Sequence, residues 1–138
     1  MKMYSEVISV RTRQVLEFVD ISSEMEGAVE RSGIASGLIL LRSRHTTAAI
    51  TCTESDPDVH QDCRELLEDL MPVNRDYHHV YEGRVNARAH QAEMLGFGHA
   101  SWAPVREGKP DLGTWQRVYL IELFQPMIRR IDCVMIGE

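Results

Sequence analysis

The sequence predicts an α+β fold: a largely antiparallel β-sheet core with two main helices and one short helix, in a single domain over residues 1–138. The chain is long enough for one real core, and 43% hydrophobic and 26% charged residues are ordinary values for a globular protein. Helical patterns lie in the middle of the chain. Strand-like segments joined by short turns lie around them, and such strands pair antiparallel.

The first elements are expected to be two strands and a short helix. Alternating apolar residues predict strands at residues 6–13 and 15–21. Ser23, followed three residues later by Glu26, forms a capping-box pattern in which each side chain bonds to the other residue's backbone amide. A short helix is therefore expected to start there, and Gly33 to end it in a left-handed conformation.

The clearest helix follows two apolar segments. Residues 37–43 and 45–53 are rich in Ile, Leu and Thr and predict either one bent strand or two. Asp56 is a good N-cap, and the proline after it is a good first helical residue. Apolar residues then recur at helical spacing up to Leu70, and Pro72 stops the run.

The second half of the chain combines a polar loop, one more helix and three strands. Residues 74–85 are polar and loop-like, and the next helix is expected at residues 86–95 with Gly96 as its stop. Strands are predicted at residues 100–105, 117–124 and 129–136, between turns that contain Gly or Pro.

Charge and cysteine content narrow the class of protein. The formal net charge of −6 provides no overall positive field, which argues against a nucleic-acid partner. No apolar run approaches the roughly 18 residues that span a bilayer, and the first residues lack the apolar stretch of a secretory signal. Three cysteines without a paired spacing indicate reduced thiols. We therefore expect a cytoplasmic protein with no membrane partner.

Arg44-His45-Thr46-Thr47 is the tightest cluster of polar chemistry in the chain, and it lies in an otherwise apolar, strand-like run. Unpaired buried polar groups are costly, so this imidazole and these hydroxyls must find partners or open into a cavity. A lone His in a strand is more often a satisfied structural residue, and threonine is an ordinary strand former. The structural and the functional interpretations both stay open.

A second polar cluster consists of His79, Glu82 and His90, which fall within twelve residues of one another. If Asn86 caps the next helix, His90 lies on its first turns and the preceding loop can fold the other two side chains back toward it. Neutral imidazoles and a carboxylate are suitable ligands for zinc or another divalent metal. The alternative is a polar surface loop. His60 and His99 have no comparable polar cluster near them in the sequence and are interpreted as surface or loop residues.

Two features near the C-terminus complete the candidates. Thr114, Trp115 and Gln116 offer hydrogen-bonding groups beside a large aromatic face, although a turn that enters a strand explains them equally well. Glu122 lies among apolar residues of a predicted strand, so its carboxylate needs an Arg or a His as partner. Arg129-Arg130 is interpreted as a solvated strand start. There is no GxSxG elbow, P-loop or GxGxxG pattern.

The order of these motifs along the whole chain resembles the YjbQ-like family, commonly labelled secondary thiamine-phosphate synthase. The resemblance rests on the following segments in order: His45-Thr46-Thr47-Ala48-Ala49, Asp56-Pro57-Asp58-Val59, Tyr77-His78-His79, Asn86 with Ala89-His90, Leu112-Gly113-Thr114-Trp115-Gln116, and Tyr119-Leu120 with Glu122. It implies an α+β homotrimer with a polar site around His45, His79 and His90. It also implies a small-molecule substrate that carries phosphate.

The resemblance first implies an enzyme that joins hydroxymethylpyrimidine diphosphate to thiazole phosphate and releases pyrophosphate. A divalent metal (Zn or Mg) held by His45, His79 and His90, or the protonated imidazoles themselves, would neutralise the developing charge. Arg44, Arg88 and amides near Asn86 would hold phosphate.

Two alternatives stay open. One is a metal-dependent hydrolase of a small phosphorylated or carbonyl metabolite, with Glu82 or Glu122 as general base. The other is a non-enzymatic ligand-binding or assembly module. The candidate substrate-binding residues are Arg44, Thr46, Thr47, Asn86, Arg88, Thr114, Trp115 and Gln116.

Overall fold

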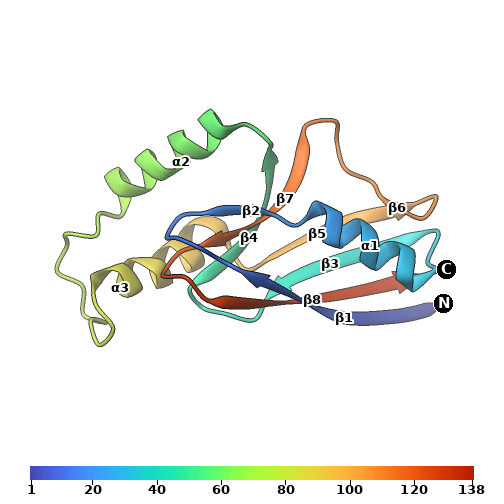
Figure 1. Ribbon diagram of the computed structural model, residues 1–138, viewed down its shortest axis with the longest axis horizontal. Helices are drawn as coiled ribbons and strands as arrows, with labels where there is room; N and C mark the ends of the chain where they lie inside the picture. Colours follow the sequence, from blue (N-terminus) through green and yellow to red (C-terminus); the bar gives the residue numbers. More distant parts are fainter.

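Two antiparallel sheets form the body of the molecule in the computed structural model, which describes residues 1–138 (Figure 1). The five-stranded sheet has the order β1-β8-β3-β5-β6, and the three-stranded sheet has the order β2-β7-β4. The strands of the larger sheet are β1 (Lys2–Arg11), β3 (Gly37–Ser43), β5 (Ala100–Arg106), β6 (Lys109–Pro110) and β8 (Ile128–Gly137). Those of the smaller sheet are β2 (Phe18–Asp20), β4 (Ala48–Glu54) and β7 (Gln116–Glu122).

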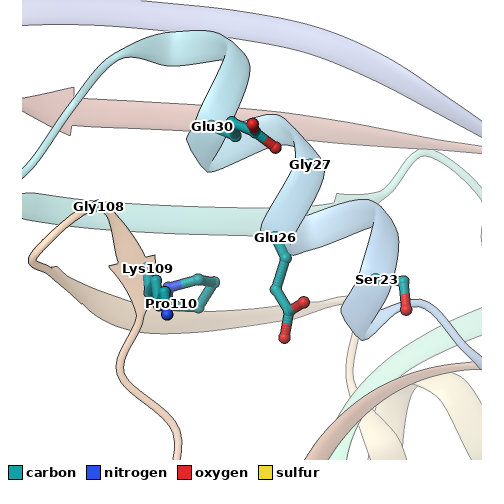
Figure 2. A pocket seen from close by; sticks show the side chains of 7 residues that line it. All are labelled: Ser23, Glu26, Gly27, Glu30, Gly108, Lys109 and Pro110. Carbon is teal, nitrogen blue, oxygen red and sulfur yellow. The ribbon is translucent and has the colours of Figure 1, made fainter.

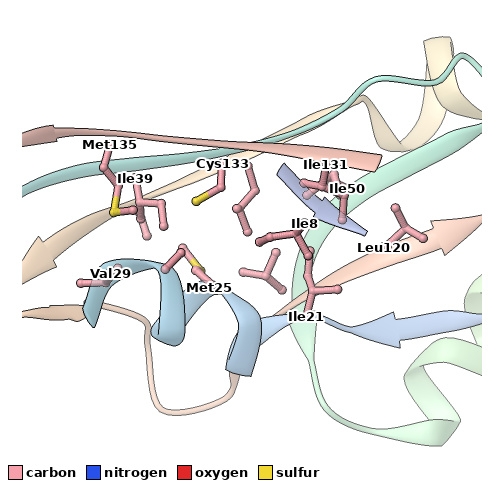
Figure 3. Close-up of a cluster of buried hydrophobic side chains, with 14 of the residues drawn as sticks. Ile8, Ile21, Met25, Val29, Ile39, Ile50, Leu120, Ile131, Cys133 and Met135 are labelled. Carbon is pink, nitrogen blue, oxygen red and sulfur yellow. The ribbon is translucent and has the colours of Figure 1, made fainter. Parts of the chain in front are cut away.

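The main core lies between the five-stranded sheet, helix α1 (Ser22–Ser32) and the smaller sheet. Met25 and Val29 of α1 point at Ile39, Cys133 and Met135 on the sheet, and all five are at most 1% exposed (Figure 3). Burial alternates along β3 and β8, as it must for strands with one face on a core. These observations confirm the predicted α+β class.

Sequence signals located the helices well where a side chain caps them. Helix α2 (Pro57–Leu70) begins after Asp56, whose Oδ1 accepts a 2.8 Å hydrogen bond from the Asp58 amide. Gly33 ends α1 in the left-handed conformation, with φ of 67°. Ser23, however, does not cap α1. The Asp20 carboxylate accepts instead from the Ser22 amide at 2.9 Å, because the chain turns directly from β2 into the helix.

The expected strand over residues 45–53 is shorter than predicted. Strand β4 begins only at Ala48, so His45, Thr46 and Thr47 form a loop between β3 and β4. Pairing explains the start of β4, because Ala48 is opposite Glu122, the last residue of β7, and residues before Ala48 have no partner strand. The predicted strand over residues 15–21 is also reduced, to the three residues of β2.

The helix predicted at residues 86–95 differs at both ends. Helix α3 (Arg84–Gln91) begins after Gly83, and it continues into a π-helical segment, η1 (Ala92–Phe97). Gly96 lies inside this segment, and the helix ends at Gly98, whose amide bonds to the Glu93 carbonyl at 2.8 Å. A smaller apolar cluster, which includes Ala89, Ala92 and Ile121, packs this helical segment against the smaller sheet.

His60 is buried rather than on the surface. Its ring stacks on Phe18 with 4.3 Å between ring centroids, and its Nε2 lies 2.9 Å from the carbonyl oxygen of Glu54, so Nε2 must donate. Its role is to anchor α2 to the smaller sheet.

None of the helices combines the length and the hydropathy that a membrane-spanning helix needs.

Candidate functional site

A cavity of about 360 Å³ opens where the β3–β4 loop, the start of α3 and the β7–β8 turn meet. We call it the His45/His90 cavity. It brings the first polar cluster together with Glu82 and His90 of the second, although His45 and His90 are 45 residues apart in the sequence. The cavity is lined by Arg44, His45, Thr46, Thr47, Glu82, Asn86, His90, Phe124, Gln125, Met127 and Arg129.

A buried ion pair supports one wall of this cavity. Glu122 is fully buried and Arg129 is 1% exposed, with Arg129 Nη2 2.5 Å from Glu122 Oε2 and Arg129 Nε 2.8 Å from Oε1. The Thr12 hydroxyl donates to Oε1 at 2.6 Å, and the Phe124 amide donates to Oε2 at 3.0 Å. Every acceptor direction of the carboxylate is therefore engaged.

This network keeps Glu122 ionised. Burial would raise the pKa of the Glu122 carboxyl, but the hydrogen bonds from Arg129 and Thr12 outweigh it and hold the pKa below its ordinary value. Glu122 does not line the cavity. Its carboxylate therefore orients Arg129 and is poorly placed to accept a proton from a ligand.

Arg129 is the site residue that the sequence interpretation missed, because a solvated strand start was expected there. Arg129, Ile131, Cys133 and Met135 alternate along β8 and are all buried. This alternation, together with an acidic residue in a neighbouring apolar strand, was the available signal. Nη2 also donates to the Thr47 hydroxyl at 3.0 Å, whereas Nη1 has no hydrogen-bond partner.

His45 lies on the cavity wall with a defined hydrogen bond. The backbone amide of Arg130 donates to His45 Nε2 at 2.8 Å, so Nε2 carries the lone pair and Nδ1 carries the proton. Partial burial and the positive charge of Arg129 lower the pKa of the imidazole. His45 is therefore a neutral ring whose free nitrogen is a donor.

The other two histidines touch each other. The rings of His79 and His90 are edge-to-face with centroids 4.8 Å apart, and Tyr81 packs on the other side of His79 at 5.1 Å. His90 lines the His45/His90 cavity, but His79 lines a neighbouring hollow of about 330 Å³. No group of three or more His, Cys, Asp and Glu side chains is placed to hold a metal ion. The residues as arranged thus do not fit the predicted three-histidine metal site, and the metal stays a prediction.

The start of α3 contributes unpaired hydrogen-bond donors. Gly83 is the N-cap, no side chain caps the helix, and Glu82 and Asn86 at this end line the cavity. Asn86 is only 3% exposed, and its Oδ1, an acceptor, is completely buried with no hydrogen-bond partner. A buried acceptor without a partner is rare in proteins and calls for a donor such as water, whereas the Nδ2 of the same amide is the group that can donate to a ligand.

Several predicted binding residues lie elsewhere. Arg88 is buried against α2, where its Nη1 pairs with Glu68 at 3.1 Å, and it does not reach the cavity. Thr114, Trp115 and Gln116 lie at the start of β7, six residues from Glu122 at its end, which is roughly 20 Å along a strand. Trp115 is 72% exposed, and within one chain these three residues do not meet the histidines.

A wider hollow of about 650 Å³ lies between α1 and β6 (Figure 2). Glu26 and Glu30 of α1 face it on one side, and Lys109 lies on the other. It holds no histidine or cysteine and no unpaired buried group. We name it the α1–β6 hollow.

Fold and site together define a class of small α+β proteins that combine two antiparallel sheets with a polar cavity where the β3–β4 loop, α3 and the β7–β8 turn meet. A family model described as "UPF0047 protein YjbQ-like" matches residues 6–138, and the chain belongs to this family. A UPF0047 protein of Methanothermobacter thermautotrophicus is 36% identical over 138 residues, covering 100% of this chain and 95% of that one. YugU of Bacillus subtilis is 32% identical over 133 residues, covering 96% and 98%.

Solved structures agree with this assignment. The crystal structure of a YbjQ-like protein of unknown function from Sulfolobus solfataricus P2 superposes with a TM-score of 0.93 at 36% identity, covering 99% of both chains. A hypothetical protein from Aeropyrum pernix K1 gives a TM-score of 0.90 at 28% identity, covering 98% of this chain and 99% of that one.

Proposed function

We propose that the protein binds a small anionic metabolite, with phosphate esters as the first class, in the His45/His90 cavity. The observation that carries the proposal is a set of hydrogen-bond donors without acceptors around one space. These donors are Arg129 Nη1, the side-chain Nδ2 of Asn86 and the backbone amides at the uncapped start of α3. Helix N-termini and guanidinium groups favour anions, and phosphate oxygens accept several hydrogen bonds at once.

We further propose that His90 and Glu82 provide acid–base chemistry beside the bound anion. Both line the cavity, and His90 keeps a ring nitrogen that no other residue engages. His45, with its Nε2 occupied by the Arg130 amide, acts as a neutral donor from Nδ1. Donors fixed before the ligand arrives stabilise developing negative charge without reorganising.

The specific reaction implied by the family resemblance is the formation of thiamine phosphate with release of pyrophosphate. A site rich in donors for phosphate is compatible with a pyrophosphate leaving group, which needs charge neutralisation. Purified protein would be incubated with both substrates and Mg²⁺, and thiamine phosphate quantified. Product formation that survives His45→Ala and His90→Ala would exclude the cavity as the site of that reaction.

Assembly as a homotrimer is also part of the proposal. The outer face of the five-stranded sheet supports it, because Leu40 is opposite Trp102 and Leu38 is opposite Ile136, and all four are 38–67% exposed. A contiguous exposed apolar patch of this kind marks an interaction surface.

Anion binding is tested by titrating ¹⁵N-labelled protein with ethyl phosphate. We expect the amide signals of residues 84–86 to shift, and Asn86→Leu to weaken binding about tenfold, the loss of one hydrogen bond to a charged group. Glu30→Gln in the α1–β6 hollow is the matched control and should leave the affinity unchanged. The proposal would be wrong if ethyl phosphate shifted no amide signal of α3, or if the Asn86→Leu variant bound ethyl phosphate as tightly as the wild-type protein.

A further inference from the structure

A second cavity shares a wall with the first. It has a volume of about 470 Å³ and includes the same Arg44, His45 and Thr46, while the rest of its lining comes from the end of β3, from Glu93 and from His99. Every side chain that lines it is polar. We call it the Glu93/His99 cavity. Residues 44–46 thus face two spaces, and a ligand in one lies next to the other.

Glu93 is a partly buried carboxylate to which no residue donates a hydrogen bond. Its side chain is 14% exposed, and the basic group that pairs with it is His99, whose Nδ1 lies 3.7 Å from Oε1, too far for a hydrogen bond. The arginines nearby are committed to Asp132, with Arg42 Nη2 at 2.8 Å and Arg44 Nε at 3.5 Å. The free acceptor oxygens of this partly buried carboxylate are therefore available to a donor or a cation in the cavity, and partial burial strengthens such a pairing.

The π-helical segment η1 places Glu93 and His99 together. The Gly98 amide bonds to the Glu93 carbonyl five residues earlier at 2.8 Å, so the helix closes one residue later than an α-helix would. The Ser43 amide then bonds to the His99 carbonyl at 2.7 Å and fixes the end of this turn against β3. Such π-turns are rare and concentrate at functional sites.

We propose that the Glu93/His99 cavity is a second subsite for the same ligand and that it takes a protonated amine. The ligand would carry an anionic group in the His45/His90 cavity and an ammonium group beside Glu93, on either side of residues 44–46. An ammonium group would donate to the carboxylate oxygens of Glu93 and neutralise the charge of this partly buried side chain. This inference rests on the proposed function, because it places the anionic end of the ligand in the first cavity.

The test compares ω-aminoalkyl phosphates of two, three and four carbons with alkyl phosphates of the same length, by calorimetry at pH 7. At one length or more, the amine should bind about tenfold more tightly than its alkyl partner, as expected for a partly desolvated charge pair. Glu93→Gln should abolish this preference and leave the affinity for the alkyl phosphate within about twofold. Glu30→Gln, which removes the same charge from the α1–β6 hollow, should preserve the preference (Figure 2).

Two results would overturn the second subsite alone. They are equal affinity of amine and alkyl partners at all three lengths, and a preference that persists in Glu93→Gln. If neither the aminoalkyl phosphates nor the alkyl phosphates bind, the proposed anion site fails as well. The experiment therefore distinguishes failure of the second subsite from failure of the proposed function.

Discussion

Glu122 has four donors around its two oxygens: two nitrogens of Arg129, the Thr12 hydroxyl and the Phe124 amide. This arrangement leaves the carboxylate no capacity for an incoming proton or metal. It fixes the guanidinium of Arg129 so that Nη1 stays without a partner. At the scale of single residues, the cavity therefore offers a ligand a positioned cation, Arg129, and a neutral hydrogen-bond donor, His45.

Glu122→Gln should destabilise the protein by about 3 kcal/mol, because it leaves Arg129 as an uncompensated buried charge. The measurement is urea unfolding, read as a lower midpoint at unchanged slope. Asp111→Asn is the control, since it breaks the exposed pair with Arg106 and should cost less than about 1 kcal/mol. Equal losses in the two variants would mean that the buried pair contributes no more than a surface pair.

Part of the site could be predicted from single residues, and part could not. His45, His90 and Glu82 do line one cavity, and the need of Glu122 for a cation was evident from its apolar neighbours. Arg88 gave no such signal. Its positive charge suggested a phosphate contact, but the direction of a side chain around a helix depends on where the helix begins, and α3 begins two residues before the predicted start.

At the scale of elements, the backbone conformation at Gly83 determines how α3 begins. Its φ of 92° and ψ of 173° lie in a region that is essentially restricted to glycine. The turn leaves the first amides of the helix without a capping side chain. A residue with a Cβ at this position would have to rotate the start of the helix, and with it Glu82 and Asn86.

Gly83→Ala should cost about 2 kcal/mol of stability from backbone strain alone, because nothing lies within 4 Å of the added methyl group. Gly96→Ala is a close control: its Cβ also meets open space, but its φ is not positive, so it should be neutral or stabilising by up to about 1 kcal/mol. Thermal unfolding of both variants measures the difference. A Gly83→Ala variant as stable as Gly96→Ala would show that α3 starts without strain.

Two helix ends that carry a residue-specific signal were predicted well, although the capping box expected at Ser23 does not form, and the ends that are defined only by the backbone were not predicted. Asp56 and Gly33 carry the signals that define α2 and the end of α1. The start of α3 has no capping side chain. The π-turn of η1 cannot be recognised from periodicity, because it changes which carbonyl accepts a bond without adding a distinctive residue.

At the scale of the whole molecule, the five-stranded sheet has one covered and one open face. Outward-facing apolar side chains lie on neighbouring strands, so that Met3 is opposite Ile136 and Leu38 lies beyond it. Alternation predicted which residues share a face. Which strands are neighbours could not be predicted, since β1 pairs with β8 and β3 lies between β8 and β5, far apart in the sequence.

Leu40→Glu should convert the proposed homotrimer to single chains, because it puts a charge at the centre of the open face, opposite Trp102. Light scattering coupled to size exclusion measures the mass directly. Leu70→Glu on α2, where the side chain is 76% exposed, adds the same charge outside this face and should leave the mass unchanged. A wild-type protein that elutes as a single chain would itself contradict the proposed assembly.

The ion pair of Glu122 and Arg129 connects β7 of one sheet to β8 of the other, and the same guanidinium faces the cavity. The same two residues therefore stabilise the fold and position the cation of the cavity. A lineage that loses Arg129 would lose stability together with the proposed anion binding. Natural selection for a stable domain would thus preserve the cation in the cavity even where the ligand changes, and if the proposed function holds, descendants with different ligands would keep an anionic group in common.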